Sequence, residues 1–197
     1  HGMKWEPGDE VLICDLEHSA LTVPAGVLAQ RKGVTVNSVG IPMRAQPDEI
    51  LQLVQEALSP RTRLVALSHI QYTCGLMMPI KEITRAAHER GIPILVDGAQ
   101  SVGQIEVNVK ELGCDFYAMS GQKWLLGPVG TGVLYIDPNR REMLEPQFTT
   151  NALELERPTE RLPMARFSVA SQNPGLVAGL IEGVRIATDI GLGNIER

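Results

Sequence analysis

The sequence lacks long apolar runs, paired cysteines and an excess of charge of one sign. No apolar stretch approaches the roughly 18 residues that a membrane-spanning helix requires. The 197 residues include 18 Lys and Arg against 23 Asp and Glu, which gives a formal net charge of −5. Because nucleic acid and anionic membranes attract basic surfaces, this mildly acidic balance argues against both as the main partner.

The three cysteines, Cys14, Cys74 and Cys114, lie far apart and show no paired spacing. An odd and scattered set is typical of reduced thiols, so we expect a cytoplasmic protein without a disulfide framework. The four histidines show no metal-ligand spacing either, and no metal site is predicted. A composition that is 44% hydrophobic and 21% charged is ordinary for a globular protein.

Short apolar runs alternate with amphipathic segments along most of the chain. The apolar runs predict strands at 10–15, 34–41, 63–70, 93–97, 116–120 and 132–137. The amphipathic segments predict helices at 19–31, from 47 onward, at 79–90 and at 174–190. Strands that are apolar on both faces and separated by helices predict an α/β fold, a three-layer αβα sandwich with a mainly parallel sheet. Residues 153–164 are rich in charge and proline and predict an exposed excursion.

Polar residues follow four of the predicted strands. In a parallel α/β sheet, binding sites lie beyond the carboxyl ends of the strands, so we expect these side chains to meet on one rim. They are Asp15, Glu17 and His18 after the first strand, Ser68, His69, Gln71 and Tyr72 after the third, Asp97 and Gln100 after the fourth, and Ser120, Gln122 and Lys123 after the fifth.

Asp97 and Lys123 form the pair with the clearest chemistry. A lysine on a tight glycine turn after a buried strand is partly desolvated, which favours the neutral amine that attacks a carbonyl. A carboxylate on a neighbouring strand end can keep a ring nitrogen protonated, and Ser120 with the backbone amides of the turn can bind phosphate oxygens. Pyridoxal phosphate needs this division of labour. A helix-capping Asp97 and a surface Lys123 are the alternative interpretation of the same pattern.

Three motifs carry a resemblance to a known family: ILVDGAQS at 94–101, DFYAMSGQK at 115–123 and GPVGTG at 127–132. Together they resemble the class V aminotransferase family, which includes cysteine desulfurases and cysteine or cystine lyases. GDEV at 8–11 and the pair Glu17-His18 are similar to earlier motifs of the family, so the resemblance spans nearly the whole chain. The 26-residue step from Asp97 to Lys123, with Gln100 three residues after the aspartate, makes it specific.

The resemblance implies that residues 1–197 are the large domain of a fold-type-I enzyme, with pyridoxal 5'-phosphate as its cofactor. The sequence opens without an initiator methionine and stops just after a long helical pattern, so we expect a piece of a longer protein. By resemblance, an N-terminal segment with a phosphate-binding turn and a C-terminal small domain would lie outside it. The family also implies a homodimer and a small amino acid as substrate.

The resemblance assigns roles residue by residue. Lys123 would hold the cofactor as a Schiff base and move the proton of the substrate Cα, Asp97 would pair with the ring nitrogen, and Gln100 would bind the phenolic oxygen. His18 would stack on the ring and assist proton transfer, although a histidine that only begins a helix is the alternative. Ser120 would bind the phosphate.

By the same resemblance, three further positions would bind the cofactor, and none of them carries the residue that the family usually has there. Gln122 stands where the family usually has a histidine, and it can still donate to phosphate without carrying a charge. Tyr72 stands where desulfurases commonly have an asparagine near the cofactor oxygen. Ser171 matches a threonine that reaches the phosphate of a partner subunit, and a plain polar loop residue fits there equally well.

The implied reaction is cleavage of the C–S bond of cysteine or cystine, by a desulfurase or a lyase. An aminotransferase or epimerase of the same family shares the early steps and stays open as an alternative. A non-catalytic remnant that keeps only the scaffold is the second alternative. We expect an enzyme, and little or no activity for this chain in isolation.

Overall fold

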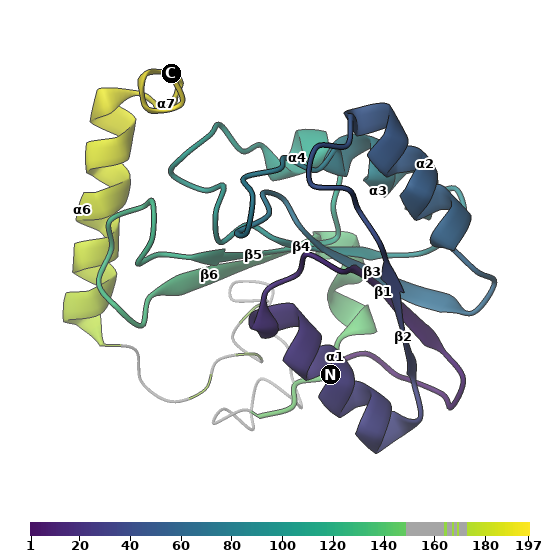
Figure 1. Ribbon diagram of the computed structural model, residues 1–197. Coiled ribbons are helices and arrows are strands. Elements are labelled where there is room, and N and C mark those ends of the chain that lie inside the picture. Colours follow the sequence, from purple (N-terminus) through teal and green to yellow (C-terminus); the bar gives the residue numbers. More distant parts are fainter. Residues whose placement is uncertain (149–163, 165–166, 168, 170–172) are drawn as a thin grey trace.

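The computed structural model describes residues 1–148, 164, 167, 169 and 173–197 (Figure 1). Six strands form one sheet in the spatial order β2-β1-β3-β4-β5-β6. They are β1 (Glu10–Cys14), β2 (Thr35–Val39), β3 (Thr62–Ser68), β4 (Ile94–Asp97), β5 (Phe116–Ser120) and β6 (Gly132–Ile136). The first five strands run parallel, and β6 pairs antiparallel with β5.

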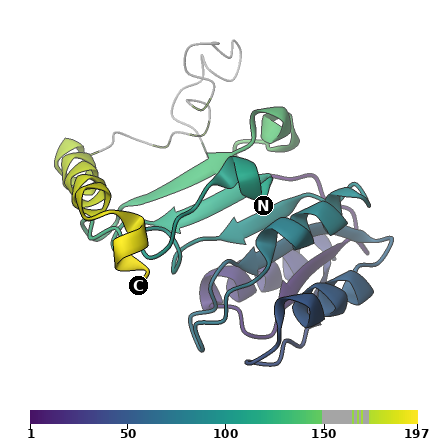
Figure 2. The same ribbon diagram turned by 90° about the horizontal axis from the view of Figure 1, so that it is seen from above.

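Helices lie on both faces of the sheet, with α1 on one face and α2, α3 and α4 on the other (Figure 2). The described residues form α1 (Ser19–Lys32), α2 (Pro47–Ala57), α3 (Ile80–His88), α4 (Val109–Leu112), the 3-10 helix η1 (Pro138–Met143), α6 (Pro174–Ile190) and α7 (Leu192–Ile195). This arrangement confirms the predicted α/β class with a mainly parallel sheet between helical layers.

The residues of β1 show why its sequence is an unbroken apolar run. Val11 and Ile13 face α1 and join one buried cluster, whereas Leu12 and Cys14 face α2 and α3 and join the other. Successive side chains of a strand point to opposite faces, so a strand covered on both sides favours apolar residues at successive positions. All five residues of β1 are buried, including Glu10 at its start.

The observed elements differ from the predicted ones mainly in where they begin and end, and one strand, β6, runs antiparallel to its neighbour. Helix α6 has the predicted bounds, and β2 is shorter than the predicted 34–41. Strand β6 reverses because residues 121–131 form a loop with no crossover helix, and a strand that returns without a crossover must run antiparallel. Helices α4, η1 and α7 were not predicted, since four to six residues are too few to show a hydrophobic period. The excursion predicted at 153–164 lies outside the described residues, apart from Met164.

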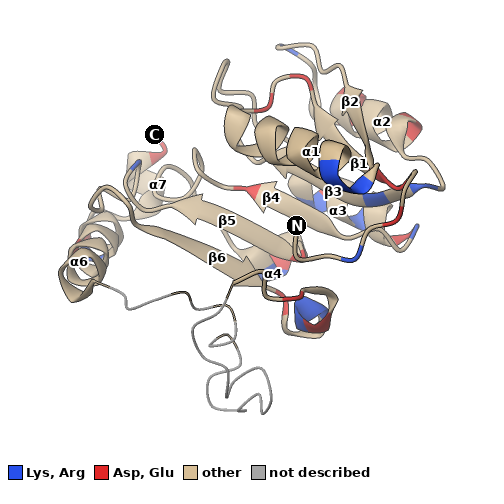
Figure 3. Cartoon of the chain, turned by 90° about the horizontal axis from the view of Figure 1, so that it is seen from below, with Lys and Arg blue, Asp and Glu red and all other residues tan. Residues whose placement is uncertain are grey.

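Carboxylates at the amino ends of the strands are paired with cations, and Figure 3 shows acidic and basic residues side by side where β1 and β3 begin. Glu10, only 5% exposed, forms an ion pair with Arg61 at 2.8 Å between Oε1 and Nη2. Asp115, 2% exposed, accepts from Arg140 Nε at 2.6 Å and from His88 Nε2 at 2.8 Å. These contacts join segments that are far apart in the sequence and hold this end of the sheet together.

The described residues offer neither a membrane-spanning helix nor a metal site. None of the helices in residues 1–148 and 173–197 is long and apolar enough to cross a membrane. No group of three or more His, Cys, Asp or Glu side chains is arranged to bind a metal ion in the part of the chain that the structure describes. All three cysteines are free, with Cys14 and Cys114 buried and Cys74 exposed.

Candidate active site

A pocket of about 190 Å³ lies at the carboxyl ends of β3, β4 and β5. Ser68, Asp97 and Ser120 are the last residues of these three strands, and parallel strands place such ends at one edge of the sheet. Six of the eight predicted site residues line the pocket: His18, Tyr72, Asp97, Gln100, Ser120 and Lys123. Its lining is completed by Ala20, Ser68, Ile70 and Ala99.

Asp97 and Lys123 are both half-buried in this pocket. Asp97 Oδ1 accepts a hydrogen bond from the backbone N–H of Ala99 at 2.9 Å, so the aspartate caps the turn after β4 instead of a helix. Within the described residues, Asp97 Oδ2 has no hydrogen-bond partner and Lys123 forms no ion pair. A carboxylate oxygen and an amine therefore face the pocket without protein partners there, which suits a ligand that carries both a basic ring nitrogen and a carbonyl.

The orientation of Gln100 is set by a neighbour of the lysine. Trp124 Nε1 donates to Gln100 Oε1 at 2.9 Å. Because an indole N–H can only donate, the amide oxygen must be the atom that faces it. The amide nitrogen is then left as a donor, in accord with the predicted hydrogen bond to a phenolic oxygen.

His18 both begins helix α1 and lines the pocket, so the two interpretations of this residue are compatible. Its Nδ1 accepts a hydrogen bond from the backbone N–H of Ala20 at 3.1 Å, which caps the helix. The ring of Tyr72 meets the imidazole edge-on, with 4.8 Å between centroids and an interplanar angle of 85°. Since Nδ1 acts as an acceptor, a neutral His18 carries its proton on Nε2.

Two predicted residues are not brought into the pocket by the described structure. Gln122 is exposed and its Oε1 accepts a hydrogen bond from the backbone N–H of Gly130 at 2.7 Å, so it ties together the two ends of the loop after β5. Ser171 lies outside the described residues.

The polar residues at the end of β3 and just after it were expected together on the rim, and the structure separates them. Ser68, Ile70 and Tyr72 line the pocket, whereas His69 and Gln71 point to the interior and are buried. Ser68 was expected on this rim without a cofactor role of its own, and it lines the pocket as the last residue of β3. His69 Nδ1 lies 2.9 Å from the Tyr117 hydroxyl, and burial lowers the pKa of His69 to about 4. It is therefore a neutral interior residue at pH 7.

The loop that carries Lys123 is held by close backbone packing. A Cβ atom on Gly121 would lie 2.4 Å from Thr131 Oγ1, and a Cβ atom on Gly183 of α6 would lie 2.1 Å from Leu125 O. Both positions therefore require glycine. Leu126 adopts a left-handed backbone conformation with φ 56°, and such strain persists only where the surroundings fix the chain. These contacts limit the freedom of the lysine backbone.

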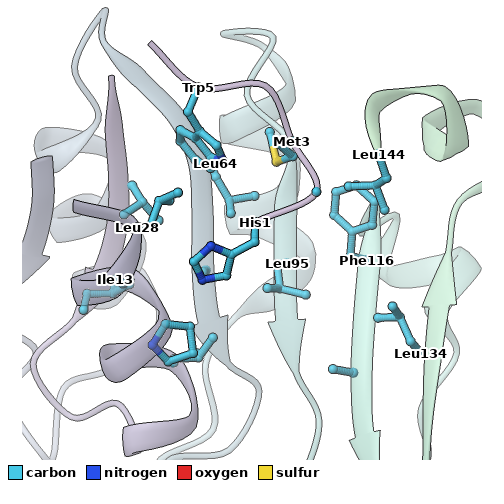
Figure 4. Close-up of a pocket in the computed structure, with 17 residues that line it drawn as sticks. His1, Met3, Trp5, Ile13, Leu28, Leu64, Leu95, Phe116, Leu134 and Leu144 are labelled. Carbon is cyan, nitrogen blue, oxygen red and sulfur yellow. The ribbon is translucent and has the colours of Figure 1, made fainter. Parts of the chain in front are cut away.

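A larger cavity of about 340 Å³ lies on the α1 side of the sheet, away from these residues. Figure 4 shows Trp5 and Leu28 on one wall and Phe116 and Leu134 on the other, with His1 between them. None of the described residues that line this cavity carries a carboxylate, a lysine amine or a hydroxyl group. Apart from the imidazole of His1, the surface that these residues offer is apolar. The smaller pocket brings a lysine, a carboxylate and serine hydroxyls together, so it is the candidate active site.

The chemistry of the pocket fits one cofactor class. An amine, a carboxylate with an unpartnered oxygen, an amide donor, a hydroxyl at a strand end and an imidazole ring all line one opening. Pyridoxal phosphate has one group for each: an aldehyde, a ring nitrogen, a phenolic oxygen, a phosphate and a flat ring face. The residues present therefore fit this cofactor.

Comparison with known proteins gave consistent matches over the whole chain. The family model described as aminotransferase class-V matches residues 1–197. Isopenicillin N epimerase from Streptomyces clavuligerus is 36% identical, over 93% of this chain and 46% of its own length. The apo structure of a cysteine desulfurase from Thermococcus onnurineus NA1 has a TM-score of 0.87 at 33% identity, covering 98% of this chain and 48% of that one.

A complex of the cystine C–S lyase C-DES with its reaction product cysteine persulfide is similarly close. It has a TM-score of 0.87 at 29% identity, covering 96% of this chain and 52% of that one. The chain thus spans about half the length of the relatives it matches.

Proposed function

The chain belongs to the class V aminotransferase family, and on that premise we propose that it forms the pyridoxal-phosphate-binding domain of an enzyme that cleaves a C–S bond of cysteine or cystine. The observation that carries the proposal is the single pocket at the carboxyl ends of β3, β4 and β5. Five of its lining side chains match the chemistry of this cofactor: Lys123, Asp97, Gln100, Ser120 and His18.

Pyridoxal phosphate supplies an aldehyde for Schiff-base formation and a ring that withdraws electrons when its nitrogen is protonated. In the proposal, Lys123 Nζ attaches it and, once released, moves the proton of the substrate Cα. Asp97 Oδ2 holds the proton of the ring nitrogen, and Gln100 Nε2 donates to the phenolic oxygen. The Ser120 hydroxyl and the amides of the following turn bind the phosphate, and His18 covers one face of the ring.

The choice of C–S cleavage is supported by the names of two similar structures, a cysteine desulfurase and a cystine C–S lyase. The similarity to an epimerase favours a second candidate, epimerisation of an amino acid. Both reactions begin with loss of the Cα proton, so the same pocket residues serve either one. They differ in whether the β-substituent leaves or the proton returns to Cα. Transamination, a further alternative, also begins with loss of the Cα proton. We further propose that the protein is a homodimer and lies in the cytoplasm.

The first test is to add pyridoxal phosphate to the full-length protein that carries this sequence, reduce it with borohydride and map the modified peptide. We expect one adduct, on Lys123. Lys123→Arg should abolish it, while Lys110→Arg serves as a control because Lys110 is exposed on α4, outside the pocket. Adducts spread over surface lysines would contradict the proposal and favour a non-catalytic scaffold.

The second test separates the reactions in the same preparation. Cysteine and cystine should release sulfur as sulfide or persulfide. Exchange of the Cα proton of alanine in deuterated water, without sulfur release from cysteine or cystine, would reject C–S cleavage. It would instead support the epimerase or aminotransferase.

A further inference from the structure

We propose that Glu17 is a positioning residue, whose buried carboxylate holds His18, Ser68 and Tyr72 in place around the candidate active site. The inference deepens the proposed function and rests on it, because that function makes the pocket a cofactor site. Glu17 itself does not line the pocket, and it acts through residues that do.

The carboxylate of Glu17 is 6% exposed and accepts four hydrogen bonds. Its Oε1 accepts from the backbone N–H of Ser68 at 2.9 Å and from Gln71 Nε2 at 3.1 Å. Cys14 Sγ also donates to Oε1, at 3.2 Å, and Ser68 Oγ donates to Oε2. Burial, with the Glu17 carboxylate beside the sulfur, raises the pKa of Cys14, so the thiol keeps the proton that it donates.

These hydrogen bonds connect three segments of the pocket wall. Ser68 ends β3 and lines the pocket directly. Gln71 begins the loop that carries Tyr72, and its backbone closes that loop through Gln71 N to Leu76 O at 2.9 Å and Gly75 N to Gln71 O at 2.8 Å. Glu17 directly precedes His18, whose ring packs against Tyr72. One carboxylate therefore fixes a strand end, a loop and a helix start relative to one another.

The carboxylate offers an acceptor to all four donors, and its charge strengthens each hydrogen bond. In Glu17→Gln, an amide N–H in the place of Oε2 would meet the Ser68 hydroxyl, which would have to turn its own proton away in order to accept. The other three hydrogen bonds would lose their charged acceptor, and the weaker contacts would let the local structure move. We expect the movement to reach His18 and Tyr72, since both are attached to this network.

The test compares Glu17→Gln with Glu10→Gln. Glu10 is a matched control: it is 5% exposed, begins the strand β1 that leads toward Glu17, and is also held by several hydrogen bonds, but at the opposite end of the sheet. The first readout is the imidazole signal of His18 in NMR spectra of protein without added cofactor. It should shift in Glu17→Gln and stay unchanged in Glu10→Gln.

The second readout is the dissociation constant for pyridoxal phosphate. It should rise by about tenfold in Glu17→Gln, the size of effect expected from a lost charged hydrogen bond, and remain within about twofold of wild type in Glu10→Gln. Unchanged His18 signals and cofactor affinity in a folded Glu17→Gln would overturn the proposal. If the wild-type protein does not bind the cofactor at Lys123, the proposed function is rejected. The NMR comparison still decides whether Glu17 positions His18.

A second variant keeps the test decisive if Glu17→Gln does not fold. Gln71→Met removes one of the four donors, and it also removes an amide oxygen that has no hydrogen-bond partner in the described structure. It should therefore leave thermal stability nearly unchanged, yet shift the ring signals of Tyr72 and His18. Unshifted rings in Gln71→Met would count against a network that positions the pocket wall.

Discussion

At the amino ends of the strands, the buried carboxylates of Glu10 and Asp115 form ion pairs with Arg61 and Arg140. At the carboxyl ends, Glu17 is equally buried, but within the described residues it accepts hydrogen bonds only from neutral groups. In a buried ion pair the two charges already neutralise each other, so neither group is available to bind a ligand. The amino ends of the sheet therefore use their charges to hold the fold together.

The carboxyl ends keep their charges unpaired and close together. Asp97 and Lys123 line one pocket, and neither forms an ion pair within the described residues. Buried or half-buried charge therefore marks a candidate site only where its partners are neutral or missing. Substitutions at the two ends of the sheet should accordingly separate function from stability.

Lys123→Ala should remove activity and leave the fold intact. Loss of a group that moves a proton lowers turnover by about 10²–10⁴-fold, and the lysine has no ion pair in the described structure to lose. Turnover with cysteine and the thermal midpoint of the apoprotein measure the two effects. A large drop in the thermal midpoint would show that the charge of Lys123 also stabilises the fold, and would contradict the distinction between the two ends of the sheet.

Asp115→Asn should have the opposite profile. Loss of one partner from a buried ion pair costs about 3 kcal/mol of unfolding free energy, and here it also disturbs contacts with His88 and the backbone N–H of Ile94. Denaturant unfolding measures the loss. Cofactor affinity per folded molecule should match wild type, and a weaker affinity would show that the two ends of the sheet are coupled.

Acid should destabilise the interior beneath the pocket through His69. Burial lowers the pKa of this histidine from 6.5 to about 4, so between these values the unfolded chain binds more protons than the folded one. Its contribution is full above pH 6.5 and falls as the pH drops toward 4, by about 3 kcal/mol in total. Unfolding free energies measured from pH 7 to 4 should follow this slope. His69→Gln should flatten it, and an unchanged slope in that variant would contradict the assignment.

Gly183→Ala should displace the loop that carries Lys123. The added Cβ would lie 2.1 Å from Leu125 O, and such overpacking costs about 1–3 kcal/mol. Because the loop is displaced, the fraction of Lys123 that borohydride reduction labels with pyridoxal phosphate should also fall. Gly26→Ala in α1 is the matched control, because a Cβ there meets nothing within 4 Å and helix propensity should raise stability by about 0.5–1 kcal/mol. Equal labelling in both variants would show that α6 does not position the lysine.

Leu126→Gly should have the smallest effect. Leucine at φ 56° costs about 1–2 kcal/mol relative to glycine, and the greater freedom of glycine in the unfolded chain offsets part of the gain. The side chain is 67% exposed, so little packing is lost. A net gain of up to about 1 kcal/mol is expected in denaturant unfolding. A clear loss would mean that this turn is not strained.

Sequence alone determined the α/β class, the positions of five strands that run parallel and the bounds of α6, because buried strands and long helices leave local, periodic patterns. It also located seven of the lining residues of the pocket, through the polar residues that end or follow buried strands. The family resemblance, confirmed over residues 1–197, supplied their proposed roles.

Only the tertiary structure decided which polar residues face the pocket and which lie beneath it. At the end of β3, Ser68 lines the pocket while the next residue, His69, is buried beside Tyr117. The loop after β5 directs Gln122 to Gly130. The role of Glu17 depends on partners about 50 residues away in the chain, Ser68 and Gln71. Such contacts are fixed by strand register and packing between distant segments, and these leave no pattern in the local sequence.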